Sequence, residues 1–464
     1  MNNVSGGPLR RHRDTGARIA KVAAVGVIAS LALAACAAPA ADPSVVTLWY
    51  TPYTGDASVE EWGVFNIEPF EARFTDATVD AVVVPGESSI QKQAVALAAG
   101  TGPDIVGATG STTAIPLFEA GYLADLGDTA AENNWANKIL PWALDLAYID
   151  GKLVAIPTSY ETLVLYYNKT LFDDNGWEPP MNRASLEKLA GEMQAKGIIP
   201  FAAGNADYQP ATEWLVSTYL NQVAGPSSLY AAIKGEIPWT DPSIEASIQM
   251  MKDDFEAGWY AGGVKQYFTT QDTQKYTQLA DGEAGMFVSG SWEMDGLGAY
   301  FGVDGNTNEW AWAPLPPLAD GVPSGIFPLA VGGTASVNAG SKSIENAKNY
   351  LSWLFDDTAS MWDRVEAGVG QPLPVKYEES DVPAGVDARY AAQYAAINDA
   401  SEAGLVGYVT WTSMGPKSQA FVVDNIDKVI NGDQSVADFC AGLDEAFVDD
   451  RAKGLVPPAF TTND

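Results

Sequence analysis

The chain has few side chains that can act as nucleophiles, general bases or metal ligands near neutral pH. It holds one histidine, His12, and two cysteines, Cys36 and Cys440. A domain that begins after residue 35 therefore has no histidine-assisted nucleophile and no zinc site built from histidine or clustered cysteine. Cys440 stands at helical spacing with apolar residues, which is typical of a small buried side chain. Carboxylates, hydroxyls and the rings of 14 Trp and 19 Tyr remain for chemistry, and we expect neither a metal ion nor a cofactor.

Residues 1–35 have the composition of an export signal. A basic head precedes the apolar run 22–34 and the tetrapeptide Leu33-Ala34-Ala35-Cys36. The run would span only about 20 Å as a helix, less than the ~30 Å core of a membrane. The tetrapeptide resembles the bacterial lipobox, which implies a mature protein anchored by lipidated Cys36 to the outer face of the cytoplasmic membrane. The alternative is a plain signal peptide with an incidental cysteine.

Composition limits what the exported part can bind. A short tether, residues 36–44, leads into a chain that is long enough for two domains, with 47% apolar residues to fill their cores. The full chain has a net charge of −33, and the part after residue 35 is more negative still because the signal holds five basic residues and one acidic residue; this argues against nucleic acids and anionic lipid surfaces as partners. Only Cys440 follows Cys36, so no internal disulfide is expected, and stability must come from core packing.

Strand-like and helix-like segments alternate along the chain, which is typical of α/β domains with largely parallel sheets. Strands are expected at residues 45–50, 79–84, 105–106, 153–156, 163–167, 284–288 and 330–337. Helices are expected at residues 58–74, 88–99, 185–196, 211–222, 243–257, 344–355, 388–403, 416–430 and 436–447. No Gly/Ser-rich linker divides the chain, so two domains would be joined by a chain that crosses between them more than once.

Four sequence segments along the chain carry recognisable motifs. They are residues 160–172, with Leu165-Tyr166-Tyr167-Asn168-Lys169; residues 279–292, ending at Trp292; residues 100–126, opening with Gly100-Thr101-Gly102-Pro103-Asp104; and residues 329–354, opening with Leu329-Ala330-Val331-Gly332-Gly333. Together they resemble the extracellular solute-binding proteins of carbohydrate ABC importers, family 1, of the maltodextrin-binding type. Their order along the chain is the order of the family.

The resemblance implies a type II periplasmic-binding-protein fold, in which two α/β lobes are joined by crossing hinge strands. Ligand is held in the cleft between the lobes and enclosed by hinge closure. Crossings are implied near residues 155–159, near 326–331 and in the stretch after Gly368. One lobe would then comprise residues 45–157 with 328–368, and the other residues 158–327 with 369–464.

Sugar sites pair flat aromatic rings with carboxylates, amides and hydroxyls of fixed direction. The family pattern implies Glu161 as the main polar anchor, with Tyr160 beside it, and Trp292 and Trp411 as the main stacking residues. The other candidate ligand-binding residues are Tyr53 after the first strand, Ser111 where the family often has Asp, Glu213 and Trp214 at a helix start, and Gly333 through its backbone N–H. The sequence around Trp411 is also similar to that of members that handle N-acetylglucosamine or its dimers. Most aromatic residues of any chain belong to the core, and that interpretation stays open for each one.

We therefore expect a monomeric, non-enzymatic protein that captures a mono- or oligosaccharide and delivers it to the permease of an ABC importer with a cytoplasmic ATPase. Two alternatives stay open: the same fold with a non-sugar solute, and an extracellular glycoside hydrolase with two carboxylates about 5 to 9 Å apart. No side chain after residue 35 has an unperturbed pKa between 6 and 8. Ligand affinity should then change little across that range.

Overall fold

The computed structural model describes residues 42–50, 59–84, 86–108, 110–303, 305–367, 370–375, 377 and 379–460. The expected signal segment, Cys36 and Tyr53 lie outside these residues. Within the described ranges, none of the helices combines the length and apolarity that a membrane span requires. The same ranges contain no cluster of three His, Cys, Asp or Glu side chains placed to hold a metal ion.

Five strands form the first sheet, in the order β2-β1-β3-β12-β6. They are β1 (Val45–Tyr50), β2 (Thr78–Val83), β3 (Ile105–Ala108), β6 (Ile156–Pro157) and β12 (Thr334–Val337). β1 is parallel to β2 and β3, whereas β12 is antiparallel to β3 and β6. Side chains of β1 alternate between half-buried and buried, as the two-residue period of a strand requires.

The second sheet has the order β13-β11-β7-β9-β8, with β10 also paired to β7. Its strands are β7 (Tyr160–Asn168), β8 (Ile199–Phe201), β9 (Ala284–Gly290), β10 (Trp310–Ala313), β11 (Phe327–Val331) and β13 (Val406–Tyr408). β7 is buried along nearly its whole length, because it has partners along both edges. A separate hairpin joins β4 (Tyr148–Ile149) to β5 (Lys152–Leu153).

The chain passes between the two sheets at two short connections. Thr158-Ser159 joins β6 to β7, and Gly332-Gly333 joins β11 to β12. A Cβ on Gly332 would overlap the carboxyl group of Glu161, so the close approach at this connection requires glycine. The single strand expected at residues 330–337 is therefore two strands in different sheets. The chain returns to the first sheet at Gly332-Gly333, directly after the expected range 326–331. The expected residue bounds of the two lobes stay a prediction.

Residues 370–375 contact both halves of the chain. The carbonyl of Pro372 accepts a hydrogen bond from the N–H of Tyr160 at 3.3 Å, and that of Pro374 accepts one from Leu140 at 2.7 Å. This segment connects a helix that lies beside the first sheet with one that packs against β11. It falls in the stretch where the family topology implies a third crossing.

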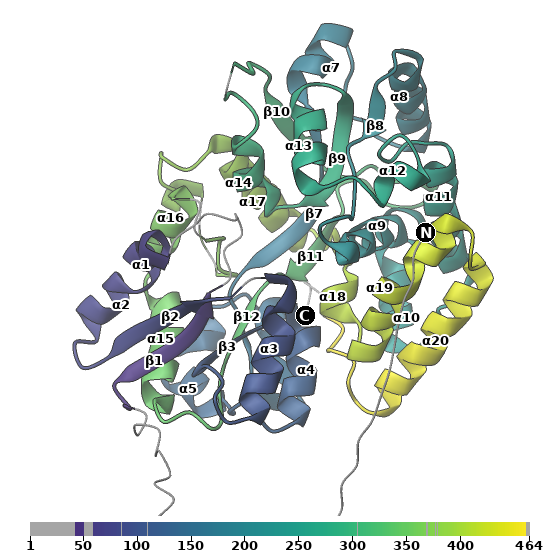
Figure 1. The fold of residues 1–464 in the computed structure, drawn as a ribbon. Coiled ribbons are helices and arrows are strands. Elements are labelled where there is room, and N and C mark those ends of the chain that lie inside the picture. The colour runs from purple at the N-terminus through teal and green to yellow at the C-terminus, as the bar shows by residue number, and fades with distance from the viewer. Residues whose placement is uncertain are drawn as a thin grey trace, which may run out of the picture. The chain divides into compact units, whose positions relative to one another are not determined.

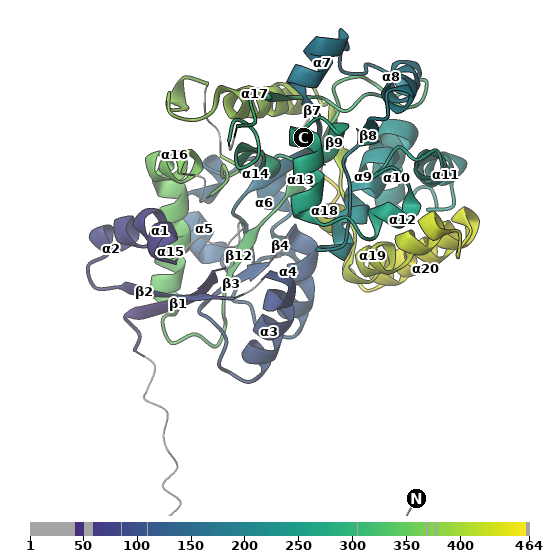
Figure 2. The same ribbon diagram turned by 45° about the horizontal axis from the view of Figure 1, so that its top comes forward.

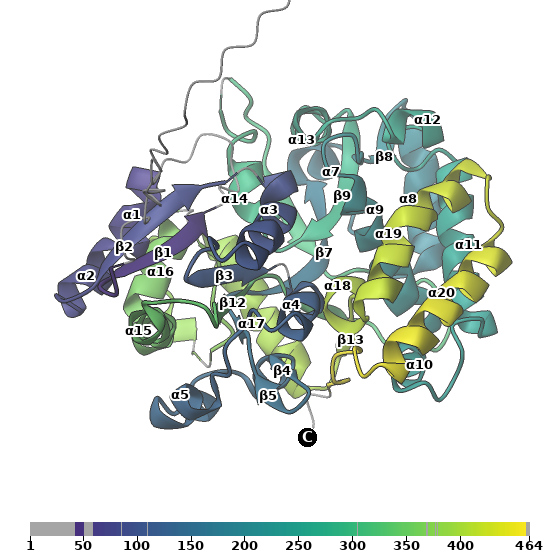
Figure 3. The ribbon, with the colours of Figure 1, turned by 60° about the horizontal axis from the view of Figure 1, so that its bottom comes forward.

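Helices cover the first sheet on both faces. They are α1 (Val59–Asn66), α2 (Glu68–Arg73), α3 (Gly86–Ala98), α4 (Gly110–Glu119), α5 (Gly127–Glu132), α6 (Pro141–Asp145), α15 (Ile344–Asp356) and α16 (Thr358–Glu366), with a 3-10 turn η1 (Trp135–Asn137). α3 and α4 contact β3, and α15 contacts β1 and β12. Figure 3 shows α3 and α15 on opposite sides of β1.

The remaining helices surround the second sheet. They are α7 (Lys169–Asn175), α8 (Arg183–Ala195), η2 (Gln209–Ala211), α9 (Thr212–Tyr219), the π-helix η3 (Leu220–Ala224), α10 (Pro226–Lys234), α11 (Pro242–Glu256), α12 (Val264–Tyr267), α13 (Asp272–Ala280), α14 (Glu293–Gly298), η4 (Glu379–Asp381), α17 (Ala388–Glu402), α18 (Thr410–Ser413), α19 (Pro416–Asn431) and α20 (Val436–Ala452). α19 and α20 lie side by side and both contact α11 (Figures 1 and 2).

One expected helix, residues 58–74, is wrong as a single element. The structure ends α1 at Asn66 and begins α2 at Glu68, with Pro69 in the first turn of α2. Proline has no N–H to donate, and its ring clashes with the carbonyl four residues earlier. A first-turn position avoids both penalties, so the helix restarts instead of continuing.

Asn168 links the end of β7 to the start of α7. Its side chain is fully buried; Oδ1 accepts the N–H of Leu171 at 2.8 Å and Nδ2 donates to the carbonyl of Leu279 at 2.8 Å. One amide therefore caps a helix and also hydrogen-bonds the last turn of a second helix, α13.

Replacing Asn168 with Ala should lower the free energy of unfolding by about 2 to 4 kcal/mol, because it removes a helix cap and the buried amide's hydrogen bonds to the carbonyls of Leu279 and Ala280. Urea denaturation measures this loss. The control is Asn137→Ala, an exposed asparagine, which should change stability by less than about 0.5 kcal/mol. Equal effects in the two variants would contradict the assigned role.

Candidate ligand-binding site

Four strands of the second sheet end at the same edge. β9 and β11 are both antiparallel to β7, and β8 and β13 are parallel to β9 and β11. The carboxyl ends of β8, β9, β11 and β13 therefore meet where β7 begins. α/β proteins bind ligands outside the carboxyl ends of parallel strands. The segments that follow these four strands carry Trp214, Trp292, Gly333 and Trp411, and β7 begins with Tyr160 and Glu161.

Four rings from three of these segments contact one another in a series, which we call the aromatic row: Tyr208, Trp214, Trp292 and Trp411. The ring of Trp292 meets those of Trp214 and Trp411 edge to face, with centroids 5.2 and 6.2 Å apart. Tyr208 stacks on Trp214 at 5.9 Å. Tyr208 is 40% exposed, Trp214 and Trp292 are half-buried, and Trp411 is only 5% exposed. The row thus runs from the surface into the protein and presents ring area along the way.

Trp411 is buried because the start of α4 packs on it. A Cβ on Gly110 would lie 2.7 Å from the carbonyl oxygen of Trp411, and the N–H of Gly110 donates to the carbonyl of Gly332 at 3.1 Å. Thr112 Oγ1 also donates to the carbonyl of Met414 at 2.7 Å. The ring of Trp411 therefore contacts that of Trp292 at the buried end of the row, and its expected stacking on a ligand stays a prediction. Ser111 follows Gly110 at the start of α4, and its contact with ligand also stays a prediction.

Glu161 has a buried carboxyl group with little hydrogen bonding. The residue is 6% exposed, and its Oε1 accepts one long bond of 3.4 Å from Ser159 Oγ. Among the described residues, no group donates a hydrogen bond to Oε2. Burial raises the pKa of Glu161 to about 8, and the bond from Ser159 opposes that rise only weakly. This carboxyl can accept from, and when protonated donate to, a ligand hydroxyl.

Glu213 is already engaged by the protein. Its Oε2 accepts from Thr410 Oγ1 at 2.7 Å, and Gln419 Nε2 lies 3.3 and 3.2 Å from the two carboxyl oxygens. Burial raises the pKa of Glu213 to about 7, against the lowering effect of these two bonds. The carboxyl group connects α9 to α18 and α19, so its expected contact with ligand stays a prediction.

Two further candidates are also bound within the protein. Tyr160 is 1% exposed, its hydroxyl donates to Asn398 Oδ1 at 3.0 Å, and it faces away from Glu161 as the next residue of a strand. Gly333 donates its N–H to Ser159 Oγ at 2.9 Å, so this N–H is not free for a sugar hydroxyl. Tyr53 lies outside the described residues.

Sequence reasoning missed Tyr208 and Lys275. Tyr208 belongs to the loop between β8 and α9, and its signal was an aromatic residue shortly before the helix that carries Trp214. Lys275 lies on α13, and its Nζ is 5.7 Å from the ring centroid of Trp214. No local pattern marks that lysine, because α13 and α9 are distant in sequence.

The pH expectation used unperturbed pKa values, and burial shifts two of them; the expected constancy of ligand affinity between pH 6 and 8 stays a prediction. Glu161 and Glu213 have raised pKa values of about 8 and about 7. Both shifts result from removal of the carboxyl groups from water, which disfavours their charged forms. The sequence contains no signal for burial of that kind.

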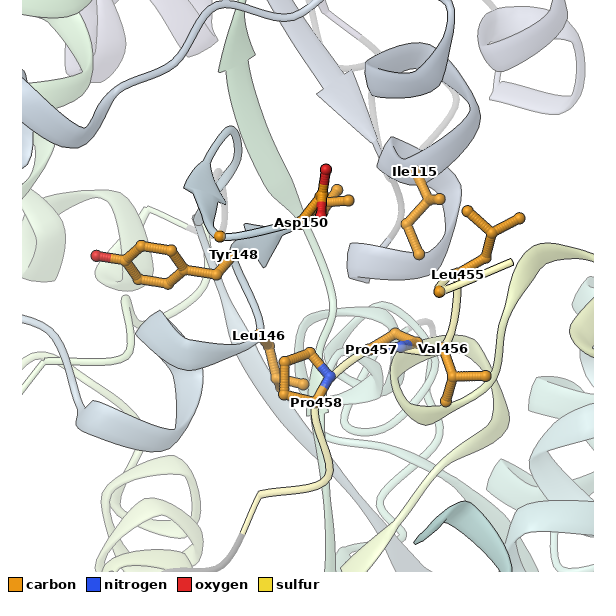
Figure 4. Close-up of a pocket in the computed structure, with 11 residues that line it drawn as sticks. Ile115, Leu146, Tyr148, Asp150, Leu455, Val456, Pro457 and Pro458 are labelled. Carbon is orange, nitrogen blue, oxygen red and sulfur yellow. The ribbon is translucent and has the colours of Figure 1, made fainter. Parts of the chain in front are cut away.

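A separate cavity of about 350 Å³ lies under the C-terminal segment. Figure 4 shows Ile115 of α4 facing Leu455, whereas the ring of Tyr148 points away from them. Its other labelled walls are Leu146, Val456, Pro457 and Pro458, with Asp150 as the one charged side chain. These walls include no member of the aromatic row and few polar groups, so this cavity lacks the chemistry of a sugar site.

Comparison with known proteins gives the family. Residues 54–361 match the family described as bacterial extracellular solute-binding protein. The chain belongs to that family. It is 25% identical to the diacetylchitobiose binding protein DasA of Streptomyces coelicolor over 81% of this chain and 85% of that protein. It is 29% identical to a probable sugar-binding periplasmic protein of Rhizobium meliloti over 40% of this chain and 44% of that protein.

Solved structures show the same fold. A chitin oligosaccharide binding protein matches with a TM-score of 0.73 and 19% identity, over 88% of this chain and 99% of that one. The GacH receptor of Streptomyces glaucescens matches with a TM-score of 0.69 and 21% identity, over 89% and 98%. The expected type II periplasmic-binding fold is confirmed.

Stability should fall as pH rises from about 4.5 to 8, because native Glu161 holds a proton that the unfolded chain has released. The loss contributed by one such group is at most ~1.4 kcal/mol per pH unit. Glu161→Gln is neutral at every pH and should flatten this slope. Urea denaturation at pH 5, 6, 7 and 8 measures it.

The control for this slope is Glu445→Gln, at an exposed glutamate of α20, which should keep the parental pH dependence. If Glu161→Gln and the parent lose stability equally between pH 5 and 8, the raised pKa of Glu161 is refuted.

Proposed function

We propose that this protein captures a sugar or oligosaccharide outside the cytoplasmic membrane and delivers it, chemically unchanged, to the permease of an ABC importer. The observation that carries the proposal is the aromatic row beside an under-bonded carboxyl group, at the carboxyl ends of four parallel strands. Membership of the extracellular solute-binding family supports the transport role. We further propose that the protein acts as a monomer.

The chemistry of the row suits a sugar. A pyranose presents apolar C–H faces and a rim of hydroxyls, which pair with aromatic rings and with directional polar groups. Trp214 and Trp292 are half-buried, so each leaves part of its ring uncovered. Glu161 supplies a carboxyl oxygen, Oε2, to which no described residue donates a hydrogen bond. Tyr208 extends the row outward, which supports a ligand of more than one sugar unit.

The relatives point to the same ligand class. One relative is named for diacetylchitobiose and one solved neighbour for chitin oligosaccharide, while another was solved with acarbose. All three ligands are saccharides, and we extend that class to this chain. N-acetylglucosamine oligomers are the first compounds to test, because the alignment with the relative named for diacetylchitobiose covers 81% of this chain.

A thermal-shift screen tests the proposal. Chitin, malto- and xylo-oligosaccharides should be compared with amino acids and short peptides on the purified protein. Ligand at 100 times its Kd adds about 2.7 kcal/mol to stability, which raises the melting temperature measurably. Chromatography of the incubated sugar should show no product. Product growth would indicate a hydrolase, and stabilisation by peptides alone would overturn the sugar assignment.

Trp292→Ala should weaken sugar binding by about 30- to 1,000-fold, because a ring that excludes water contributes about 2 to 4 kcal/mol. Glu161→Gln keeps the shape and should cost less, about 1 to 3 kcal/mol. Isothermal titration calorimetry measures both. The control is Trp353→Ala, a tryptophan buried away from the row, which should lower the melting temperature while Kd stays parental. Normal affinity in folded Trp292→Ala would refute the site.

Anchoring through Cys36 is a separate proposal, supported by the sequence Leu33-Ala34-Ala35-Cys36. Two acyl chains are needed for stable membrane attachment, since one binds only marginally. Cys36→Ala should therefore shift the protein from the membrane fraction to the soluble or secreted fraction of its host. Unchanged membrane association in this variant would refute lipidation at Cys36.

A further inference from the structure

Lys275 is a buried lysine beside the aromatic row. The residue is 3% exposed, although lysine is rarely buried so fully. Its ammonium group pairs with Asp272 Oδ1 at 2.7 Å, three residues earlier on α13. Nζ also lies 5.7, 5.2 and 5.3 Å from the ring centroids of Trp214, Tyr276 and Phe287. One carboxylate and three rings therefore surround the charge.

The ion pair alone does not account for this burial. The side chain of Asp272 is 43% exposed, and an ion pair within one helix surface contributes only about 0.3 to 0.5 kcal/mol. Removing an ammonium from water costs far more than that. The three ring faces supply further attraction, each cation–π contact being worth about 0.5 to 2 kcal/mol when desolvated. The attraction is mutual, so the cation also restrains the rings.

Helix α13, which packs against β9 (Figure 1), reaches the row at two more points. Tyr276 donates its hydroxyl to Glu293 Oε2 at 2.5 Å, and Glu293 directly follows Trp292. The N–H of Asp272 donates to Asp207 Oδ2 at 2.9 Å, and Asp207 directly precedes Tyr208. Helix α13 therefore contacts one ring of the row directly, that of Trp214, and bonds to the residues next to two others, Trp292 and Tyr208.

We infer that Lys275 is a positioning residue of the ligand site, whose ammonium group holds the ring of Trp214 in the orientation that stacks on a sugar. This inference rests on the proposed function. Among the described residues, Lys275 is the only cation over a ring of the aromatic row. Because Lys275 is almost fully buried, we expect it to act through Trp214 and not by contact with the ligand.

The test compares Lys275→Met with the parent protein. Methionine keeps the length of the side chain and removes the charge. Sugar affinity, measured by calorimetry with N-acetylglucosamine oligomers or the sugar that the screen identifies, should fall by about 5- to 30-fold. Asp272→Asn leaves the ammonium at the rings and should stay within about threefold of the parent. Lys265→Met, at an exposed lysine of α12, is the matched control and should bind as the parent does.

A purely structural role predicts a different result: a lower melting temperature of Lys275→Met with Kd within twofold of the parent, which would overturn the inference. An equal loss of affinity in Asp272→Asn would also overturn it, because the ion pair would then matter and not the ring contact.

Near-ultraviolet circular dichroism reports on tryptophan packing in the ligand-free protein. Lys275→Met should change the tryptophan bands and Lys265→Met should not, and unchanged bands in Lys275→Met would overturn the inference even if no sugar bound. Absence of binding by the parent would refute the proposed function alone.

Discussion

The pairing of β7 with β9 and β11 is the constraint on which the rest of the site depends. Both neighbours are antiparallel to β7, so their carboxyl ends lie at its beginning, beside Glu161. Strands β8 and β13 extend the same direction outward. Segments that are far apart in sequence therefore deliver Trp214, Trp292 and Trp411 to one edge. Since side chains alternate along a strand, a one-residue slip of β7 would turn Glu161 away from Gly332.

Buried carboxyl groups give the site its electrostatic character. Glu161 and Glu213 are removed from water with no cationic partner among the described residues, and each has a pKa raised toward or beyond neutrality. A carboxyl group that is partly protonated both donates and accepts hydrogen bonds, which matches the hydroxyl rim of a neutral sugar better than a fixed negative charge does.

The aromatic row is held by its surroundings before any ligand arrives. Gly290 has no Cβ where the ring of Trp292 lies, Gly110 allows α4 to cover Trp411, and Lys275 lies over Trp214. Rings that are already ordered lose little conformational entropy when a ligand stacks on them, and preorganisation of this kind raises affinity. The same packing makes the rings part of the core, which is why stability and affinity must be measured separately in each variant.

The sequence by itself determined the α/β class, because the alternation of strand and helix patterns is a local signal. Family motifs also pointed to Trp292, Trp411 and Glu161 as ligand-binding residues, which stays a prediction. The sequence also excluded histidine chemistry from the described residues, since the one histidine is His12. Only the tertiary structure decided that Gly332-Gly333 separates two sheets, that the N–H of Gly333 and the carboxyl of Glu213 are already paired, and that Tyr208 and Lys275 join the row. These facts depend on contacts between segments distant in sequence, and on burial, which sets the pKa of Glu161 and is a property of the packed chain alone.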